Sequence, residues 1–342
     1  MRVALDATYS VDPQPSGIAV YSRQLLNELA RLYPEHDFFH CYRLKQFKKA
    51  PASGWSNVRR RLLLPPLHTF RAKVFHALNQ RVDRRPSPRV VSTFHDLFVM
   101  TGEYSTPDFR ARFTRQARKA ADSSDLIIAV STFTATQVCT LLGVERSRVR
   151  VIHHGIEQPA DFASERRKLV LFVGALQARK NLIRLIEAFE TMPNDWQLVL
   201  AGAGTGFRAK EILRRIEQSH SRGRIRLTGY VSRQEKQELF SSASIFAFPS
   251  LDEGFGIPVL EAMAWGVPVI TSDGSALSEI ARGAAILVDP HRTEDIAQAL
   301  NGLASTPALA QELILKGKLR AAQFTWERAA CETFAVYTEL VG

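Results

Sequence analysis

The sequence predicts an α/β protein in which two parallel, doubly wound sheets form two separate domains. Short apolar runs of strand length alternate with longer segments of helical periodicity in both halves of the chain. A polar stretch that contains a proline, 157–167, separates the two halves. This alternation is typical of parallel sheets covered by helices, and 342 residues suit two domains of ordinary size.

Strands in the first half are predicted where apolar residues form short runs, at 1–6, 38–42, 90–94, 125–131 and 149–152. Helices are predicted where apolar residues share one face, from residue 18 onwards and at 108–122 and 132–142. Ser131 is expected to cap the last of these helices, because its hydroxyl can accept a hydrogen bond from a free backbone amide.

Strands in the second half are predicted at 168–174, 196–202, 224–232 (where the strand ends in a turn) and 245–248. Helices are expected to begin near residues 182, 233, 258, 276, 293 and 307. Asn181 is expected to cap the first of these helices.

Composition excludes several classes of protein. No run of about 18 apolar residues is present, so no segment is expected to span a bilayer. The N-terminal residues MRVALDATYS lack the apolar core of a signal peptide, so the chain is expected to be cytoplasmic. Cys41, Cys139 and Cys331 are far apart and odd in number, which predicts buried thiols rather than a disulfide framework or a metal site.

Positive charge is concentrated in the first half of the chain. Residues 1–162 carry 24 Lys and Arg against 14 Asp and Glu, whereas the remainder carries 21 against 20. Between residues 43 and 89 there are 13 basic residues and one acid, Asp83. This asymmetry predicts a negatively charged partner: a membrane surface, a phosphorylated substrate or a nucleic acid. The three arginines at 59–61 precede the apolar segment 62–67, which fits either a segment lying on an anionic membrane or a solvated face beside a core element.

The segment 249–268, PSLDEGFGIPVLEAMAWGVP, contains a candidate ligand site. It follows an apolar strand and leads through a loop with two glycines into a helix, with Pro258 suited to the first turn. Glu253 in the loop and Glu261 in the helix offer carboxylates to hydroxyl groups. The amides of 254–256 offer donors near the positive end of the helix dipole. The pattern predicts a polyhydroxylated, anionic ligand; an ordinary strand–loop–helix corner with exposed acids is the alternative.

The segment 253–261, EGFGIPVLE, resembles the E-x7-E element of the retaining glycosyltransferases of family 4, and the similarity continues to Ser272. The resemblance covers nearly the whole chain and is strongest over 168–289. It implies the GT-B fold, in which two Rossmann-like domains face each other across a cleft.

The resemblance also implies a division of labour between the two domains. Residues 1–162 are expected to bind the acceptor and residues 163–323 the nucleotide sugar. Phe324-Thr-Trp326 looks like the family's start of a terminal helix. Residues 324–342 are therefore expected to pack back on the first domain.

Residues 174–181, GALQARKN, are similar to the family's G-x-L-x-x-R-K-N element. The resemblance makes Arg179 and Lys180 catalytic, because two cations at a helix start can stabilise a departing diphosphate. Without that family context, the same cations fit an ordinary solvated surface. Many relatives carry an arginine directly after the glycine, whereas this chain has Ala175. Either Arg179 takes over that role or the phosphate clamp is weaker.

The remaining donor contacts are also assigned by the resemblance. Glu261 is expected to bind the ribose, and Glu253 is expected to hold the sugar together with the amides of Gly254, Phe255 and Gly256. Further donor-binding positions are Gly202, Tyr230 and Val231.

In the first domain the resemblance assigns Gly17 and His95. Gly17 stands at a strand-to-helix junction, where a backbone can approach a phosphate closely. His95 ends an apolar strand, and ligands of open α/β sheets bind at the carboxyl ends of strands. In the family the glycine contacts the diphosphate and the histidine lies near the donor sugar. A lone histidine at a strand end is otherwise more often structural.

The implied function is that of a retaining glycosyltransferase that moves a hexose from a nucleotide-diphosphate sugar to a glycan or lipid-linked acceptor. The motifs are similar to those of bacterial mannosyltransferases of polysaccharide assembly, which favours mannose and GDP-mannose. No metal and no other cofactor is expected, because Lys180 and Arg179 take the metal's role at the diphosphate. The basic first domain fits a peripheral position on the inner face of the cell membrane.

Three other classes of function are alternatives to this one. A nucleotide-sugar-binding protein with weak or no turnover would share the fold, and Ala175 is the feature that favours it. A nucleic-acid-binding protein is disfavoured, because no recognisable nucleic-acid module accompanies the charge. The sequence also disfavours a dehydrogenase, because GAGTG at 202–206 lacks the G-x-G-x-x-G spacing of a dinucleotide-binding loop.

Overall fold

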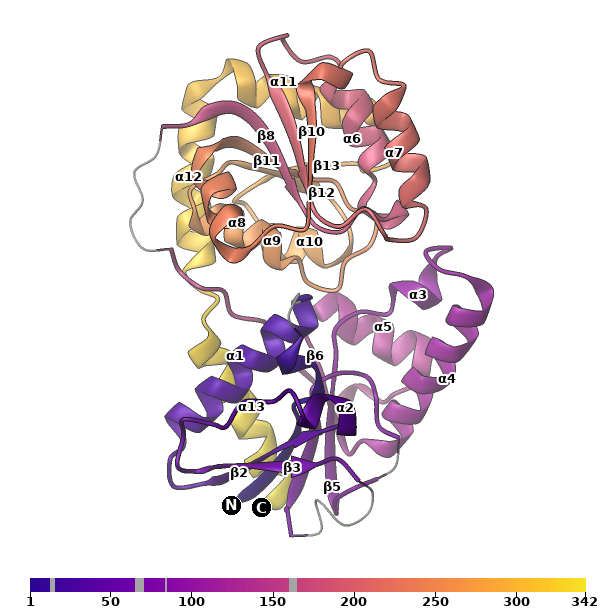
Figure 1. Ribbon diagram of the computed structural model, residues 1–342, viewed down its shortest axis with the longest axis vertical. Coiled ribbons are helices and arrows are strands. Elements are labelled where there is room, and N and C mark those ends of the chain that lie inside the picture. Colours follow the sequence, from indigo (N-terminus) through magenta and orange to yellow (C-terminus); the bar gives the residue numbers. More distant parts are fainter. Residues whose placement is uncertain (13–15, 65–70, 84, 160–164) are drawn as a thin grey trace. The chain divides into compact units, whose positions relative to one another are not determined.

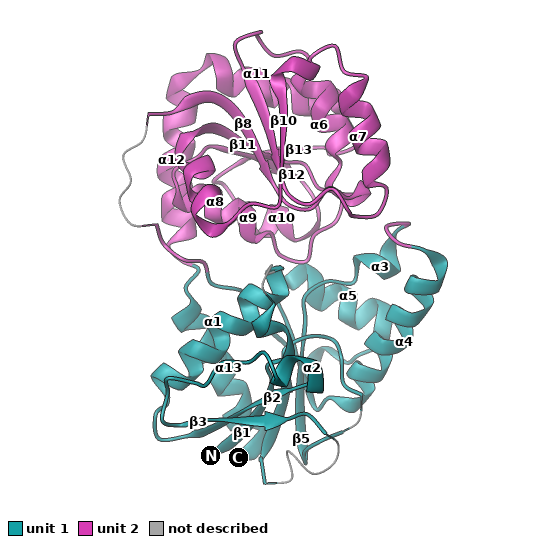
Figure 2. Cartoon of the chain, in the orientation of Figure 1, with its two compact units in different colours: residues 1–102, 106–155, 324–342 teal, residues 103–105, 156–323 magenta. Residues whose placement is uncertain are grey.

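The protein, as a computed structural model, is described at residues 1–342 except 13–15, 65–70, 84 and 160–164. The chain forms two compact units, coloured separately in Figure 2. Unit 1 consists of residues 1–102, 106–155 and 324–342, and unit 2 of 103–105 and 156–323. The main chain leaves unit 1 after Gly155, whereas the sequence predicted a boundary at residue 162.

Unit 1 is built on a seven-stranded parallel sheet with the order β3-β2-β1-β4-β5-β6-β7 (Figure 1). Its strands are β1 (Arg2–Asp6), β2 (Asp37–Tyr42), β3 (Val58–Leu62), β4 (Val74–Ala77), β5 (Arg89–Phe94), β6 (Leu126–Ala129) and β7 (Val149–Val151). Its α-helices are α1 (Gly17–Leu32), α2 (Leu44–Phe47), α3 (Phe98–Thr101), α4 (Pro107–Ser123), α5 (Thr132–Leu142) and α13 (Trp326–Val341).

Unit 2 is built on a six-stranded parallel sheet with the order β10-β9-β8-β11-β12-β13. Its strands are β8 (Arg167–Val173), β9 (Gln197–Ala201), β10 (Ile225–Gly229), β11 (Ala243–Phe248), β12 (Val269–Ser272) and β13 (Ile286–Val288). Its α-helices are α6 (Leu182–Phe189), α7 (Ala209–Glu217), α8 (Arg233–Ser242), α9 (Ile257–Ala264), α10 (Ser275–Ala281), α11 (Thr293–Ser305) and α12 (Pro307–Ala321). The prediction of two doubly wound, Rossmann-like parallel sheets is therefore confirmed.

Local capping explains why some helices begin at the predicted residues. The Ser131 hydroxyl accepts a hydrogen bond from the amide of Thr134 (3.0 Å), so α5 begins at the predicted position. Helix α8 begins with a full capping box, in which Ser232 and Glu235 each accept from the other's backbone amide. At Asn181 the expected cap is wrong, because no side-chain cap bond forms there.

The fold adds two features to the sequence analysis and corrects one of its expectations. The arginine-rich segment 59–61 belongs to strand β3 at one edge of the sheet, while 65–67 of the neighbouring apolar segment lie outside the described residues. Strand β4 was not predicted at all, because four residues that include a histidine do not form an obvious apolar run. Of the three cysteines, Cys41 is buried, whereas Cys139 is half-buried and Cys331 is exposed.

Helix α13 is held in the core of unit 1 by a buried chain of hydroxyl and imidazole groups. The Tyr337 hydroxyl lies 2.6 Å from His76 Nδ1, and His76 Nε2 lies 2.8 Å from the Thr93 hydroxyl. The Tyr21 hydroxyl, on α1, lies 3.0 Å from the same Thr93 oxygen. Burial lowers the pKa of His76 to about 3, so its ring is neutral and carries one donor and one acceptor nitrogen. The chain therefore links α13, β4, β5 and α1.

Replacing Tyr337 with phenylalanine is expected to destabilise unit 1 by about 1–3 kcal/mol. The change leaves His76 Nδ1 without its partner in a fully buried position. The measurement is the shift of the urea-unfolding midpoint of purified protein. Tyr230→Phe is the matched control, because Tyr230 is 46% exposed and its hydroxyl has water available. Equal midpoints for the two variants would contradict a stabilising role for the buried chain.

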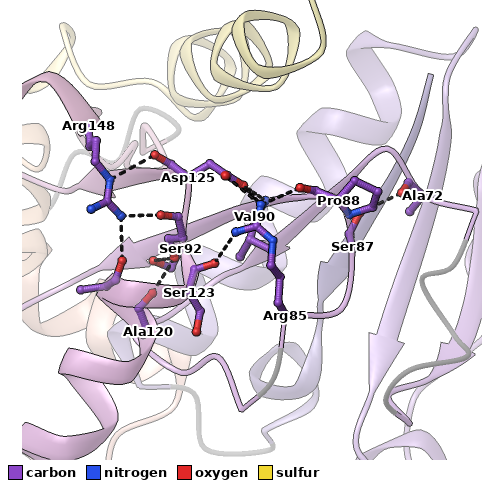
Figure 3. A network of polar contacts seen from close by, with 12 residues as sticks. Ala72, Arg85, Ser87, Pro88, Val90, Ser92, Ala120, Ser123, Asp125 and Arg148 are labelled. Carbon is purple, nitrogen blue, oxygen red and sulfur yellow. Dashed lines mark hydrogen bonds and ion pairs between the residues drawn. The ribbon is translucent and has the colours of Figure 1, made fainter.

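Several of the basic residues of the first half are used inside the fold rather than for a partner. At the amino ends of β5 and β6, the Asp125 carboxylate accepts two bonds from Arg85 Nη2 (2.8 and 2.7 Å) and one from the Val90 amide (2.7 Å), as Figure 3 shows. Arg148 donates to the carbonyls of Ala121 (2.9 Å) and Ser124 (2.5 Å) beside it. These contacts stabilise the ends of strands and helices. The number of basic residues in the first half therefore overstates how many are available to bind an anionic partner.

Candidate functional site

The topology of unit 2 identifies where a ligand should bind. The chain builds outward from β8 to β10 and then returns to place β11 on the other side of β8. Ligands of open α/β sheets bind at such a switch point, outside the carboxyl ends of the strands. The loops that leave β8 (174–181) and β11 (249–256) meet there, because these parallel neighbours end at the same edge. The Leu251 amide donates to the Arg179 carbonyl (2.8 Å) and joins the two loops.

A buried cluster of one carboxylate and two cations occupies this position. Arg179 Nη1 lies 2.7 Å from Glu253 Oε1, and Lys180 Nζ forms an ion pair with the same oxygen. Arg179 also donates to the Asp252 carbonyl (2.9 Å), and the Lys180 ammonium lies 4.5 Å from the centre of the Phe248 ring. Lys180 is 7% exposed and Glu253 is 8% exposed. Residues 73 positions apart in sequence are thus held in one site.

Arg179, Lys180 and Glu253 together carry one net positive charge, and the carboxylate of the neighbouring Asp252 is also buried. Burial alone would raise the pKa of Glu253, but the charges of Arg179 and Lys180 outweigh burial and lower this pKa to about 2. The carboxylate is therefore ionised at neutral pH and neutralises only one of the two cations. An excess positive charge in a buried position, at a switch point, suits a ligand with phosphate groups.

Asn181 holds the loop that carries both cations. Its backbone is left-handed (φ 57°), a conformation that asparagine tolerates better than most residues. Its side-chain amide donates to the carbonyls of Pro249 (3.1 Å) and Pro290 (2.6 Å), and its side-chain oxygen accepts from Arg184 (3.0 Å). One buried side chain therefore joins three loops around the cluster.

The loop between β11 and α9 is tightly packed. Gly256 has φ 108°, and a Cβ there would lie 2.7 Å from the Leu277 side chain, so only glycine fits without strain. The Phe255 side chain is part of the core. Gly254 is also buried, and the Glu253 carbonyl accepts from the Ala276 amide (3.2 Å). The proposed ligand contacts of Gly254, Phe255 and Gly256 are therefore those of their backbone amides.

Glu261 is engaged by a lysine that sequence reasoning did not single out. Lys236 Nζ, from α8, lies 2.6 Å from Glu261 Oε1, on α9. The two side chains are 29% and 21% exposed, so the pair is partly shielded from water. Lys236 lies in a helix whose sequence is polar and typical of a solvent-exposed surface. No local pattern distinguishes this lysine from its neighbours.

The other predicted donor-binding positions have different surroundings. A Cβ on Gly202 would lie 1.9 Å from the Gly174 carbonyl oxygen, so the packing of strand ends already requires glycine there. Tyr230 is exposed and Val231 is half-buried, in the turn between β10 and α8. A role of these three residues in donor binding stays a prediction.

In unit 1, His95 is buried directly after β5. Its Nε2 lies 2.8 Å from the Leu78 carbonyl, which can only accept, so Nε2 carries the hydrogen. Burial lowers the pKa of His95 to about 4 and keeps the ring neutral at pH 7. Its Nδ1 lies 3.4 Å from His154 Nε2, and the two rings stack. Gly17 is the exposed first residue of α1, and residues 13–15 before it lie outside the described residues.

Within the described residues, unit 2 brings together three of the predicted site residues, Arg179, Lys180 and Glu253. Glu261 stands apart from them, in its ion pair with Lys236. The described part of the chain contains no group of three or more His, Cys, Asp and Glu side chains arranged to hold a metal ion. Likewise, no described helix has the length and apolar character needed to cross a membrane.

Comparison with known families assigns both halves of the chain. Residues 15–158 match the family described as Glycosyltransferase Family 4, and residues 156–320 match the family described as Glycosyl transferases group 1. The chain therefore belongs to the glycosyltransferases that combine these two domains, and it is a transferase of the GT-B fold.

Individual relatives agree with this assignment. The chain is 27% identical to the O-antigen chain mannosyltransferase B of Escherichia coli, over 97% of this chain and 98% of that protein. Sucrose-phosphate synthase from Thermosynechococcus elongatus shares the fold with a TM-score of 0.80 and 21% identity, over 100% and 99% of the two chains. HepE from Anabaena, solved in complex with UDP and glucose, has a TM-score of 0.74 and 15% identity, over 99% and 100%.

Proposed function

We propose that the protein is a retaining glycosyltransferase that transfers a hexose, in the first instance mannose, from a nucleotide-diphosphate sugar to a glycan or lipid-linked acceptor. The observation that carries this proposal is the buried cluster of Glu253, Arg179 and Lys180 at the switch point of unit 2. Two cations on one carboxylate leave a positive charge for the diphosphate, and Glu253 keeps both cations in position until the donor binds.

In the proposed reaction, the bond between the anomeric carbon and the diphosphate oxygen breaks. The acceptor oxygen forms its bond to the same carbon from the same face of the sugar. The acceptor's proton passes to the departing phosphate oxygen, so no protein carboxylate is needed as a nucleophile. Lys180 and Arg179 stabilise the charge that develops on the diphosphate, which is the role a metal ion has in other transferases. His95 is also proposed to contact the sugar; its ring is neutral, and both of its nitrogens already lie within hydrogen-bond distance of neighbours in unit 1.

GDP-mannose is the proposed donor, and Glu261 is proposed to bind its ribose. Support for mannose comes from the Escherichia coli relative, which is named as a mannosyltransferase and aligns over almost the full length of both chains. Support for a nucleotide-sugar donor comes from HepE, whose structure contains UDP and glucose.

The test is a thermal-shift panel with GDP, UDP, dTDP and ADP and their common sugars, followed by product analysis with the nucleotide that binds. A ligand that binds only the folded state at 100 times its Kd stabilises the protein by about 2.7 kcal/mol. Selective stabilisation by GDP and GDP-mannose is expected. Selective stabilisation by another nucleotide would identify a donor other than GDP-mannose. Binding without turnover would favour the alternative of a nucleotide-sugar-binding protein, and no shift with any nucleotide would contradict both.

A lipid-linked acceptor is supported by basic and apolar residues that are exposed around α2 and β3 of unit 1, here called the α2–β3 surface. The exposed residues on and directly after α2 are Leu44, Lys45, Lys48 and Lys49, and those before and after β3 in the sequence are Trp55 and Leu64. Arg59 and Arg61 are exposed on β3 itself and, because side chains alternate along a strand, point to the face opposite Arg60. Arg60, between two of them, instead turns inward and donates to the Phe47 carbonyl (2.7 Å). Exposed leucine and tryptophan side chains among lysines and arginines suit the boundary of an anionic membrane.

The protein is expected to float with vesicles that contain anionic phospholipid at low salt and to be released at high salt. Reversing Lys45, Lys48 and Lys49 to glutamate is expected to reduce this binding strongly, since each lysine near such a surface contributes about 1 kcal/mol. The control reverses three exposed lysines of unit 2, Lys168, Lys210 and Lys316. Equal flotation of both triple variants and of wild type would rule out the α2–β3 surface as the contact.

A further inference from the structure

Lys236 and Glu261 form an ion pair that is placed to affect donor binding as well as the stability of the fold. The pair joins the first turn of α8 to helix α9, with Lys236 Nζ and Glu261 Oε1 2.6 Å apart. Both side chains are largely shielded from water. Glu261 is the carboxylate proposed to bind the donor's ribose, so this inference rests on the proposed function. A carboxylate that must accept from two neighbouring ribose hydroxyls has to be held in one orientation, because free rotation would cost part of the binding.

The backbone around Lys236 is fixed independently of any ligand. The capping box of Ser232 and Glu235 closes the N-terminus of α8, with bonds of 2.7 and 3.2 Å. The Lys236 amide donates to the Ser232 carbonyl (3.0 Å), so Lys236 stands in the first regular turn. Immediately before this cap lies the turn that contains Tyr230 and Val231, which is proposed to meet the nucleotide base. The lysine therefore follows the proposed base contacts in sequence and pairs with the proposed ribose contact in space.

The hydrogen-bonding groups of Glu261 and Lys236 determine how the pair can affect a ligand. An ionised carboxylate accepts through two oxygens, and the lysine ammonium only donates. Lys236 occupies Oε1 from one side, which orients the remaining acceptor positions of Glu261. We propose that Lys236 is a positioning residue that orients the Glu261 carboxylate for the ribose hydroxyls and thereby makes donor binding selective for ribonucleotides over deoxyribonucleotides.

The experiment measures the ratio of the dissociation constants of 2′-deoxy-GDP and GDP by calorimetry on the full-length protein, with 2′-deoxy-UDP and UDP as the second pair. Wild type is expected to prefer the ribonucleotide by about 10–100-fold, as for a hydroxyl bonded to a charged acceptor. In Lys236→Met the carboxylate loses its anchor, and the ratio is expected to fall to about 3 or less. Lys236→Arg keeps the charge and is expected to restore a part of the preference.

Lys316→Met is the matched control, because Lys316 forms an exposed ion pair with Glu312 within one helix of the same unit. Its ratio is expected to equal that of wild type. A purely structural role for Lys236 would weaken both nucleotides equally, so an unchanged ratio in Lys236→Met would overturn the inference. A wild type that binds both nucleotides of a pair equally would also overturn it and leave the proposed transferase function standing. A wild type that binds none of the four would overturn the proposed function as well.

Discussion

Replacing Lys180 with alanine is expected to lower kcat/KM for glycosyl transfer by about 10²–10³-fold. The ammonium is the more deeply buried of the two cations in the cluster, and it is proposed to face the charge that develops on the departing diphosphate. The fold is expected to survive, because Arg179 remains 2.7 Å from Glu253 and keeps that carboxylate paired. The measurement is steady-state transfer with the donor identified by the thermal-shift panel, together with circular dichroism of the variant.

Lys168→Ala is the matched control for this prediction. Lys168 pairs with Asp195 on the surface of the same unit, and both side chains are exposed. Its removal is expected to leave transfer unchanged, because exposed ion pairs contribute little. Near-normal turnover in a folded Lys180→Ala protein would remove the cluster from the mechanism.

Replacing Glu253 with glutamine is expected to have a different and pH-dependent effect. The change leaves Arg179 and Lys180 close together without a countercharge, which should destabilise the protein by about 3–5 kcal/mol at pH 7. The pKa of Glu253 is lowered to about 2 in the folded protein, from an ordinary value of 4.5. Its ionised form therefore stabilises the fold fully above about pH 5, and this contribution is lost as the pH falls towards 2.

The measurement is the difference in unfolding free energy between wild type and Glu253→Gln from pH 7 to pH 3. That difference is expected to shrink by about 2 kcal/mol over the range, because below about pH 4.5 the unfolded wild-type chain binds a proton at Glu253 that the folded protein does not bind until about pH 2. Glu211→Gln provides the baseline, since Glu211 is exposed and its ion pair is with the exposed Arg208. A constant difference between wild type and Glu253→Gln would show that Glu253 does not hold the two cations.

The effects expected for Lys180→Ala and Glu253→Gln differ because the single Glu253 carboxylate pairs with both cations. The sequence assigned both Lys180 and Glu253 to the donor site and did not distinguish the effects of replacing them. The geometry separates them: removing a cation leaves a balanced pair, whereas removing the carboxylate leaves two like charges in a buried position. The activity of Glu253 variants must therefore be interpreted together with their stability.

Local sequence patterns were enough to predict most of the fold. Helices α5 and α8 have the predicted bounds, because Ser131 and Ser232 supply caps that act within one turn. Most buried strands of the two sheets were visible as apolar runs, since parallel strands are covered on both faces; the short buried strand β4, which contains a histidine, was not. Strand β3 was not recognisable in this way, because an edge strand with three arginines lacks an apolar run.

What the sequence by itself determined is therefore the fold class, the family and a set of candidate positions, because periodicity, caps and motifs are properties of neighbouring residues. Only the tertiary structure decided how those positions are used. It showed that Glu253 binds two cations from a distant loop, that Asn181 joins three loops, and that Glu261 is held by Lys236. These contacts join residues from 25 to 109 positions apart, a spacing at which no local pattern carries a signal.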